Sequence, residues 1–167
     1  GYKAVGDMGE LILMLNRFTE LEVGAAQALA KFEGCHLCLE GLKTISGEVA
    51  EGLGKFKGKD LNLRGLQTLS GEAAKGLAGF RGGWLQLDGL RTISEEAAVA
   101  LGNSEGQYML SLNGLNSLSD KTAESLGRFN GTHLNLGGLQ TLSTEAAKGL
   151  SKFRGKHICF ADLRTLT

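Results

Sequence analysis

A 24-residue period runs through nearly the whole chain and constrains the fold more than any other feature. Residues 60–83 read DLNLRGLQTLSGEAAKGLAGFRGG, and the segments 24 residues before and after follow the same pattern. Each unit carries two apolar residues two positions apart: Leu13/Leu15, Leu37/Leu39, Leu61/Leu63, Leu85/Leu87, Leu110/Leu112, Leu134/Leu136 and Ile158/Phe160. One interval is 25 residues, because the segment between Leu101 and Leu110 has an extra residue and lacks the usual Phe. Such a period predicts a repeat protein whose units share one core.

Each unit combines the pattern of a strand with that of a helix. The L-x-L motif alternates as a short strand with one buried face does. Leu69, Ala73, Leu77 and Phe80 then follow the spacing of the apolar stripe of a helix. A serine precedes each of five such stripes and is the predicted N-cap: Ser46, Ser70, Ser94, Ser119 and Ser143. The predicted unit is therefore strand, turn, helix, turn.

The 26 glycines recur at fixed phases, and the chain has no proline. A glycine after each helix predicts a left-handed C-terminal turn: Gly34, Gly58, Gly82, Gly106, Gly131 and Gly155. Small residues at one helical phase are expected to let neighbouring helices approach closely: Ala28, Gly52, Gly76, Ala100, Ser125 and Gly149.

Stacked units of this kind place every strand in the same direction. Strands lie about 4.8 Å apart whereas helices are about 10 Å thick, so the stack must curve with its strands inside. The predicted fold is an α/β right-handed solenoid, with a parallel sheet on the concave face and helices on the convex face. We expect one domain over residues 1–167, with a thin N-terminal cap at 1–10. The units begin near residues 12, 36, 60, 84, 109, 133 and 157, and the last is truncated.

The motif resembles leucine-rich repeats, and more narrowly the 24-residue, helix-bearing classes called cysteine-containing and GALA-type repeats. The resemblance covers roughly residues 11–166, and it implies the horseshoe form of that family. Leu66 and its equivalents stand where the family usually has Asn or Cys, so no asparagine ladder can form. A hydroxyl series is the candidate replacement, with ordinary turn-forming residues as the alternative: Thr44, Thr68, Thr92, Ser117, Thr141 and Thr165.

The residues beside the strand leucines point away from the core and form columns that change in almost every unit. Variable positions on a constant framework are typical of a binding face, although drift of exposed residues is the alternative. The candidate binding residues on this face are His36, Asp60, Asn62, Arg64, Trp84, Gln86, Asp88, Tyr108, Met109, Ser111, Asn113, His133 and Asn135. Trp84, the only tryptophan, is a candidate interface anchor; alternatively it covers the turn at Gly82–Gly83.

Redox, metal-binding and catalytic motifs are only weakly indicated by the sequence. The C-x-x-C of Cys35 and Cys38 lies in a strand, where residues three apart face opposite sides, so neither a redox pair nor zinc is expected. His133, His157 and Cys159 form a weak metal candidate without a fourth ligand, so no metal or cofactor is predicted. No arrangement of nucleophile, base and orienting acid is evident, so we expect no enzyme.

Composition narrows the classes of partner. Eighteen basic residues balance eighteen acidic ones, which disfavours nucleic acid. No apolar run is long enough to span a bilayer, and no signal segment is visible, so the compartment remains open. The leading hypothesis is a non-enzymatic scaffold that binds a protein or peptide. Carbohydrate or surface-ligand binding and a structural spacer in a longer protein are the alternatives. Repeat ends normally need polar caps, so the thin ends of the array predict either further sequence in the natural protein or end-to-end self-association.

Overall fold

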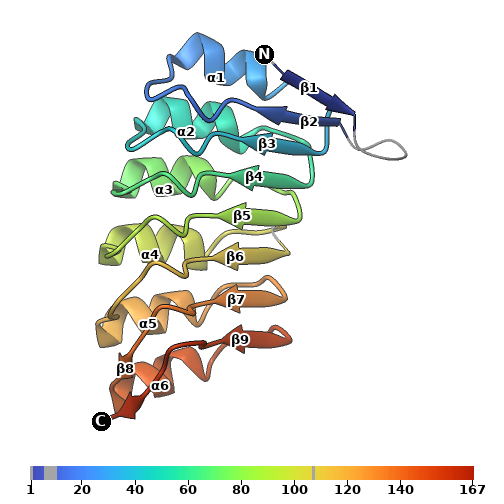
Figure 1. Ribbon diagram of the computed structural model, residues 1–167. Coiled ribbons are helices and arrows are strands. Elements are labelled where there is room, and N and C mark those ends of the chain that lie inside the picture. Colours follow the sequence, from blue (N-terminus) through green and yellow to red (C-terminus); the bar gives the residue numbers. More distant parts are fainter. Residues whose placement is uncertain (1, 6–10, 107) are drawn as a thin grey trace.

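The computed structural model describes residues 2–5, 11–106 and 108–167. The predicted cap at 1–10 falls partly outside these residues. The described part is an α/β arrangement in which strands form one face and helices the other (Figure 1). The strands of the main sheet are β1 (Tyr2–Val5), β2 (Leu11–Met14), β3 (His36–Cys38), β4 (Asp60–Asn62), β5 (Trp84–Gln86), β6 (Met109–Ser111), β7 (His133–Asn135) and β9 (His157–Cys159). The helices are α1 (Val23–Leu29), α2 (Gly47–Gly54), α3 (Gly71–Leu77), α4 (Glu95–Gly102), α5 (Asp120–Leu126) and α6 (Thr144–Leu150).

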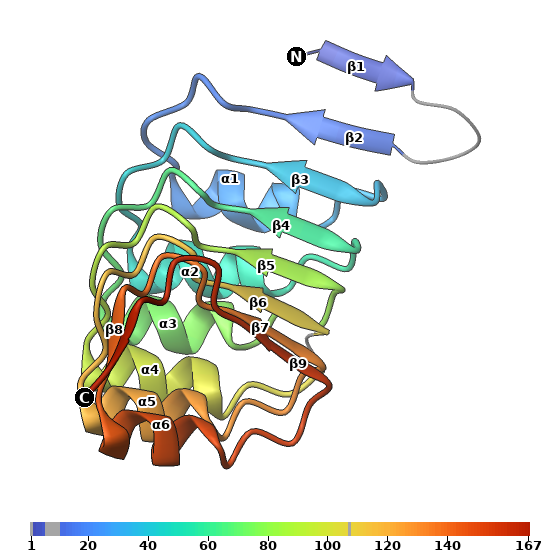
Figure 2. The ribbon, with the colours of Figure 1, turned by 60° about the horizontal axis from the view of Figure 1, so that its bottom comes forward.

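The sheet follows the order of the units. Seven strands, β2 to β7 and β9, pair in parallel with their neighbours, each in exact register with the repeat. At one end β1 pairs antiparallel with β2 (Figure 2), an addition that the repeat did not predict. At the other end β8 (Thr141–Leu142) and β10 (Thr165–Leu166) form a separate parallel pair beside α6. None of the described helices is long and apolar enough to cross a membrane.

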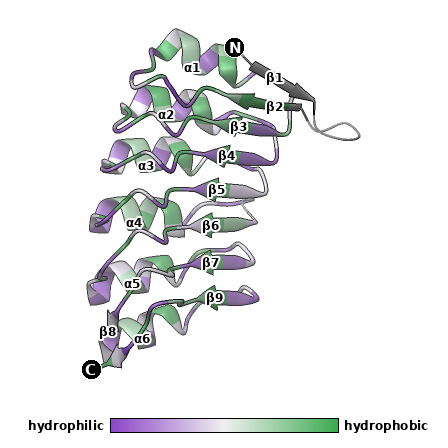
Figure 3. Ribbon diagram, in the orientation of Figure 1, coloured by the Kyte–Doolittle hydropathy of each residue, from purple (hydrophilic) through white to green (hydrophobic). Residues whose placement is uncertain are grey.

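A continuous apolar core lies between the sheet and the helices. The leucines of each L-x-L motif from Leu37 to Leu136 are buried. The residues next to them in each strand face the opposite side of the sheet. Figure 3 shows both hydrophilic and hydrophobic colours within the strands. Phenylalanines after successive helices stack, with ring centroids 6.3 Å apart for Phe32 and Phe56 and 6.2 Å for Phe56 and Phe80. Buried Ser104 takes this position in the 25-residue unit, and its hydroxyl donates to the carbonyl of Leu101 at 2.7 Å.

The five predicted serine N-caps are confirmed. In α2 to α6 the serine oxygen accepts a hydrogen bond from the backbone N–H three residues on. This bond satisfies one of the amides that a helix leaves without a partner at its N-terminus. Helix α1 has Glu22 at its N-cap position instead, and this side chain makes no such bond.

The left-handed turns predicted after the helices are wrong for the regular units. Among the described glycines only Gly106, in the 25-residue unit, has a positive φ, at 87°. Three other glycines of this series, Gly58, Gly82 and Gly155, are required by close packing. A Cβ at Gly58 would lie 2.7 Å from the carbonyl oxygen of Gly34, and one at Gly155 would lie 2.5 Å from that of Gly131. Each turn therefore sits directly on the turn of the preceding unit.

The predicted hydroxyl ladder is absent from the described hydrogen bonds. The six side chains from Thr44 to Thr165 are exposed. Backbone groups of neighbouring turns bond to one another instead, for example the N–H of Gln67 to the carbonyl of Lys43 at 2.9 Å. These contacts hold the turns in line and fix the positions of the side chains at the strand ends.

Candidate functional site

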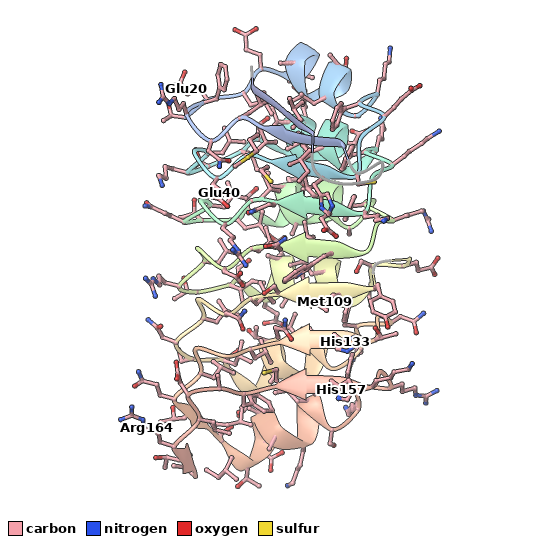
Figure 4. All side chains as sticks on the ribbon, turned by 45° about the vertical axis from the view of Figure 1, so that its right-hand side comes forward. Glu20, Glu40, Met109, His133, His157 and Arg164 are labelled. Carbon is pink, nitrogen blue, oxygen red and sulfur yellow. The ribbon has the colours of Figure 1, made fainter. Side chains whose placement is uncertain are left out.

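The strand face carries the predicted columns in register. In the first column His36, Asp60, Trp84 and Met109 are direct neighbours across successive strands, and the column continues through β7 and β9. Figure 4 shows Met109, His133 and His157 one below another along this face. The structure thus brings most of the predicted binding residues onto one surface, but it gives them different roles.

A network of polar side chains joins the units at the C-terminal ends of β3 to β6, and we call it the strand-face network: Glu40, Asn62, Arg64, Asp88, Ser111 and Asn113. At its N-terminal end the amide of Asn62 donates to the Glu40 carboxylate at 2.7 Å. The Asn62 oxygen accepts in turn from the backbone N–H of Arg64 at 3.1 Å. Asn62 is buried, at 8% exposure, so it supports the face and contributes little contact surface.

Asp88 is the centre of this network. Its carboxylate accepts from the Ser111 hydroxyl at 2.5 Å, from the backbone N–H of Asn113 at 2.9 Å and from the Arg64 guanidinium at 3.1 Å. The Asp88 side chain is 18% exposed, whereas that of Arg64 is 47% exposed. Arg64 therefore presents its remaining donors to solvent, while the half-buried carboxylate of Asp88 holds it in place.

Asn113 extends the network to the next unit. Its amide nitrogen donates to Ser111 Oγ at 2.9 Å, and its amide oxygen accepts from the backbone N–H of Gly137 at 2.8 Å. Ser111 is fully buried, and Gln86 is 7% exposed. The prediction that both would line an exposed binding surface is therefore wrong. Asn62, Gln86 and Ser111 hold the same position in successive strands, and all three are covered.

A second polar group lies at the start of β3 and β4. Nδ1 of His36 lies 2.6 Å from Oδ2 of Asp60, and about a quarter of each side chain is exposed. Burial raises the pKa of the neighbouring Cys38 thiol, and the charges of Glu40 and Asp60 raise it further, against an opposing effect of Arg64. Cys38 is thus held as the neutral thiol at neutral pH, which is the unreactive form.

The other half of the face is aromatic and apolar, and we call it the aromatic patch: Trp84, Tyr108, Met109, His133 and His157. The Tyr108 and His133 rings are tilted with centroids 5.4 Å apart, and those of His133 and His157 lie 4.9 Å apart. Tyr108 is 49% exposed. Thr132 holds the ring of His133, because its hydroxyl lies 2.7 Å from Nδ1.

Trp84 lies between Asp60 of β4 and Met109 of β6. Its side chain is half-buried, and Nε1 is covered without a hydrogen-bond partner among the described residues. A covered indole N–H without an acceptor is uncommon. The exposed part of Trp84 is thus its hydrocarbon surface, and the predicted anchor offers apolar contact rather than a hydrogen bond.

The weak metal candidate gains no support. His133 and His157 lie together, but Cys159 does not join them, and the described residues contain no group of three side chains able to hold a metal ion. Sequence reasoning also left Glu40 and Thr132 out of the binding set. Glu40 belongs to the variable column that includes Arg64 and Asp88, and that membership was the available signal.

No family model and no curated protein sequence matches the chain, so its geometry and chemistry carry the functional argument.

Proposed function

We propose that the chain is a leucine-rich-repeat solenoid, and that its strand face binds a protein or peptide without catalysing a reaction. The regular strand–helix units, their parallel register and their shared leucine core support the solenoid assignment. In that assignment the sheet is the concave face and the helices form the convex face. The binding surface then consists of the strand-face network and the aromatic patch side by side.

The observation that carries this proposal is the fixed Arg64 beside an exposed aromatic patch. Arg64 is held by Asp88, which itself receives two further hydrogen bonds. Preorganised side chains lose less conformational entropy on binding. Trp, Tyr and Arg are the residues that contribute most to protein interfaces, and this face carries all three: Trp84 in β5, Tyr108 directly before β6 and Arg64 two residues after β4.

The polar half of the face fits a carbohydrate less well than a protein or peptide. A carbohydrate site needs free donors and acceptors, but Asn62 and Gln86 are buried and the Asn62 amide is bonded to Glu40. Catalysis by a cysteine requires a thiolate, and the raised pKa of Cys38 opposes its formation. A spacer needs no aromatic patch. Protein or peptide recognition therefore explains the most features.

The test is selection of binding peptides from a random display library, followed by affinity measurements with fluorescein-labelled peptide. Trp84→Ala and Tyr108→Ala remove apolar contact, and Arg64→Ala removes the exposed guanidinium. Each is expected to weaken binding about tenfold or more, the loss typical of an interface residue that contributes strongly.

Val99→Ala is the matched control, because Val99 is an apolar side chain with 41% exposure on α4. It should leave the affinity unchanged. Equal binding to the parent and to all three strand-face variants would refute the proposal. Strong signals on a glycan array, without selected peptides, would favour the carbohydrate alternative, and no ligand in either assay would favour a spacer.

A further inference from the structure

An open apolar hollow lies at the end of the array that carries β1 and β2. Its volume is about 620 Å³, and it is lined mainly by residues of β2 and α1 and by the turn between them, among them Leu13, Leu21, Leu29 and Phe32. Leu13, Leu29 and Phe32 are half-buried, whereas their equivalents in the middle of the array, Leu61, Leu77 and Phe80, are fully covered. The hollow lies away from the strand-face network and the aromatic patch.

The helices inside the array show what normally packs against the side of a helix that lines the hollow in α1. In α2, α3 and α6 the small residue at one phase touches the preceding helix: a Cβ at Gly52 would lie 3.0 Å from Ala26, one at Gly76 2.7 Å from Ala50, and one at Gly149 3.1 Å from Ala123. Ala28 holds the same phase in α1, and it is exposed and lines the hollow. The free side of α1 is therefore a surface made for another helix.

Charges at the two ends of α1 favour one direction for a helix packed against it. Glu20 and Glu22 line the hollow before the N-terminus of α1, and Lys31 lines it after the C-terminus. Glu20 lies near this end of the molecule, far from Arg164 at the other end (Figure 4). A second α1 packed antiparallel would place its lysine beside these acids and its acids beside Lys31. The pairing would occur twice, as a twofold axis requires.

Head-to-tail stacking, with α6 of one copy against α1 of the next, fits these charges less well. Inside the array Lys152, nine residues after its N-cap, lies 2.7 Å from Glu124, which is five residues after the N-cap of the preceding helix. If the hollow received α6 of another copy in this way, Lys31 would meet Lys148, because these residues hold the same two positions. Two like charges would then replace an ion pair.

We propose that two copies of this chain associate through the hollow, with the two α1 helices packed antiparallel about a twofold axis. The exposed Ala28 lets the helices approach, and the partner's leucines and phenylalanine fill the apolar hollow. This dimer leaves the strand face of each copy open. It is therefore independent of the proposed binding function.

Sedimentation velocity over a concentration series gives the first test. The parent should change from monomer to dimer as concentration rises, and Ala28→Glu should raise the dissociation constant at least tenfold, because it buries two carboxylates at the axis. Gln27→Glu is the control: it introduces the same side chain on the same helix, but Gln27 does not line the hollow. A parent that stays monomeric up to about 0.5 mM would overturn the proposal, as would equal effects of the two substitutions.

Charge reversal tests the antiparallel arrangement. Glu20→Lys and Lys31→Glu lie outside α1 and should each weaken self-association, because they create like-charged pairs. An equimolar mixture of the two variants should restore the parent's dissociation constant to within about threefold, since every pair in the mixed dimer is again complementary. Absence of rescue on mixing would overturn the twofold arrangement.

Discussion

Gly76→Ala tests the close contact of neighbouring helices against the intrinsic preference of a helix for alanine. Gly76 lies within α3, where helix propensity alone predicts a gain of about 1 kcal/mol. The added Cβ, however, would lie 2.5 Å from the backbone nitrogen of Glu51 and 2.7 Å from the backbone carbon of Ala50. Backbone atoms cannot rotate away, so α2 and α3 must separate. Overpacking of this kind costs about 1–3 kcal/mol, and together with the propensity gain the net effect is a loss of about 1 kcal/mol.

Gly24→Ala is the matched control, because Gly24 lies in α1 and a Cβ there would meet nothing within 4 Å. It should stabilise the protein by about 0.5–1 kcal/mol. Urea unfolding followed by circular dichroism at 222 nm measures both changes. Equal stabilisation by the two substitutions would refute the argument that glycine is retained at this phase for packing.

Three further predictions concern single contacts. Ser70→Ala should lower the free energy of unfolding by about 1 kcal/mol in urea titrations, because it removes the bond that caps α3; an unchanged midpoint would contradict the capping role. The hydrogen bond and charge of Lys152, followed by the bond from Arg128, lower the pKa of Glu124, so this contribution is present at neutral pH and is lost as pH falls through the lowered pKa. Lys152→Ala should therefore destabilise the protein at pH 7, and this effect should disappear in acid once pH has fallen through the lowered pKa of Glu124; a difference independent of pH would argue against the pair. Burial and neighbouring acids raise the pKa of the Cys38 thiol. At pH 8 iodoacetamide should therefore modify Cys38 more slowly in the folded protein than in urea, and equal rates by mass spectrometry would contradict the raised pKa.

The sequence was sufficient for the features that depend on periodicity. Alternation placed Leu61 and Leu63 in the core, and the serine before each stripe marked the start of its helix. The sequence was not sufficient where one residue type can serve two structural purposes. Glycine serves both positive φ and close packing, and only coordinates show that Gly58 serves the second.

The candidate site was predictable as a surface but not as a set of contacts. The columns correctly placed Asp60 beside Trp84, because register follows from the 24-residue period. Burial of Ser111 depends on the Asp88 and Asn113 side chains that bond to it, and the period does not specify these contacts. The hollow beside α1 and the strand β1 lie where the repeat ends, so the period carried no information about them.

The indole N–H signal of Trp84 tests the binding account most directly, because the chain has one tryptophan and the signal is therefore unique in a ¹H–¹⁵N spectrum. The signal should shift or broaden when a selected peptide is added, together with the backbone signals of Tyr108 and Met109, while those of α2 to α6 stay in place. A peptide that shifts the helix signals and leaves the Trp84 indole unchanged would contradict the assignment of the strand face as the binding surface.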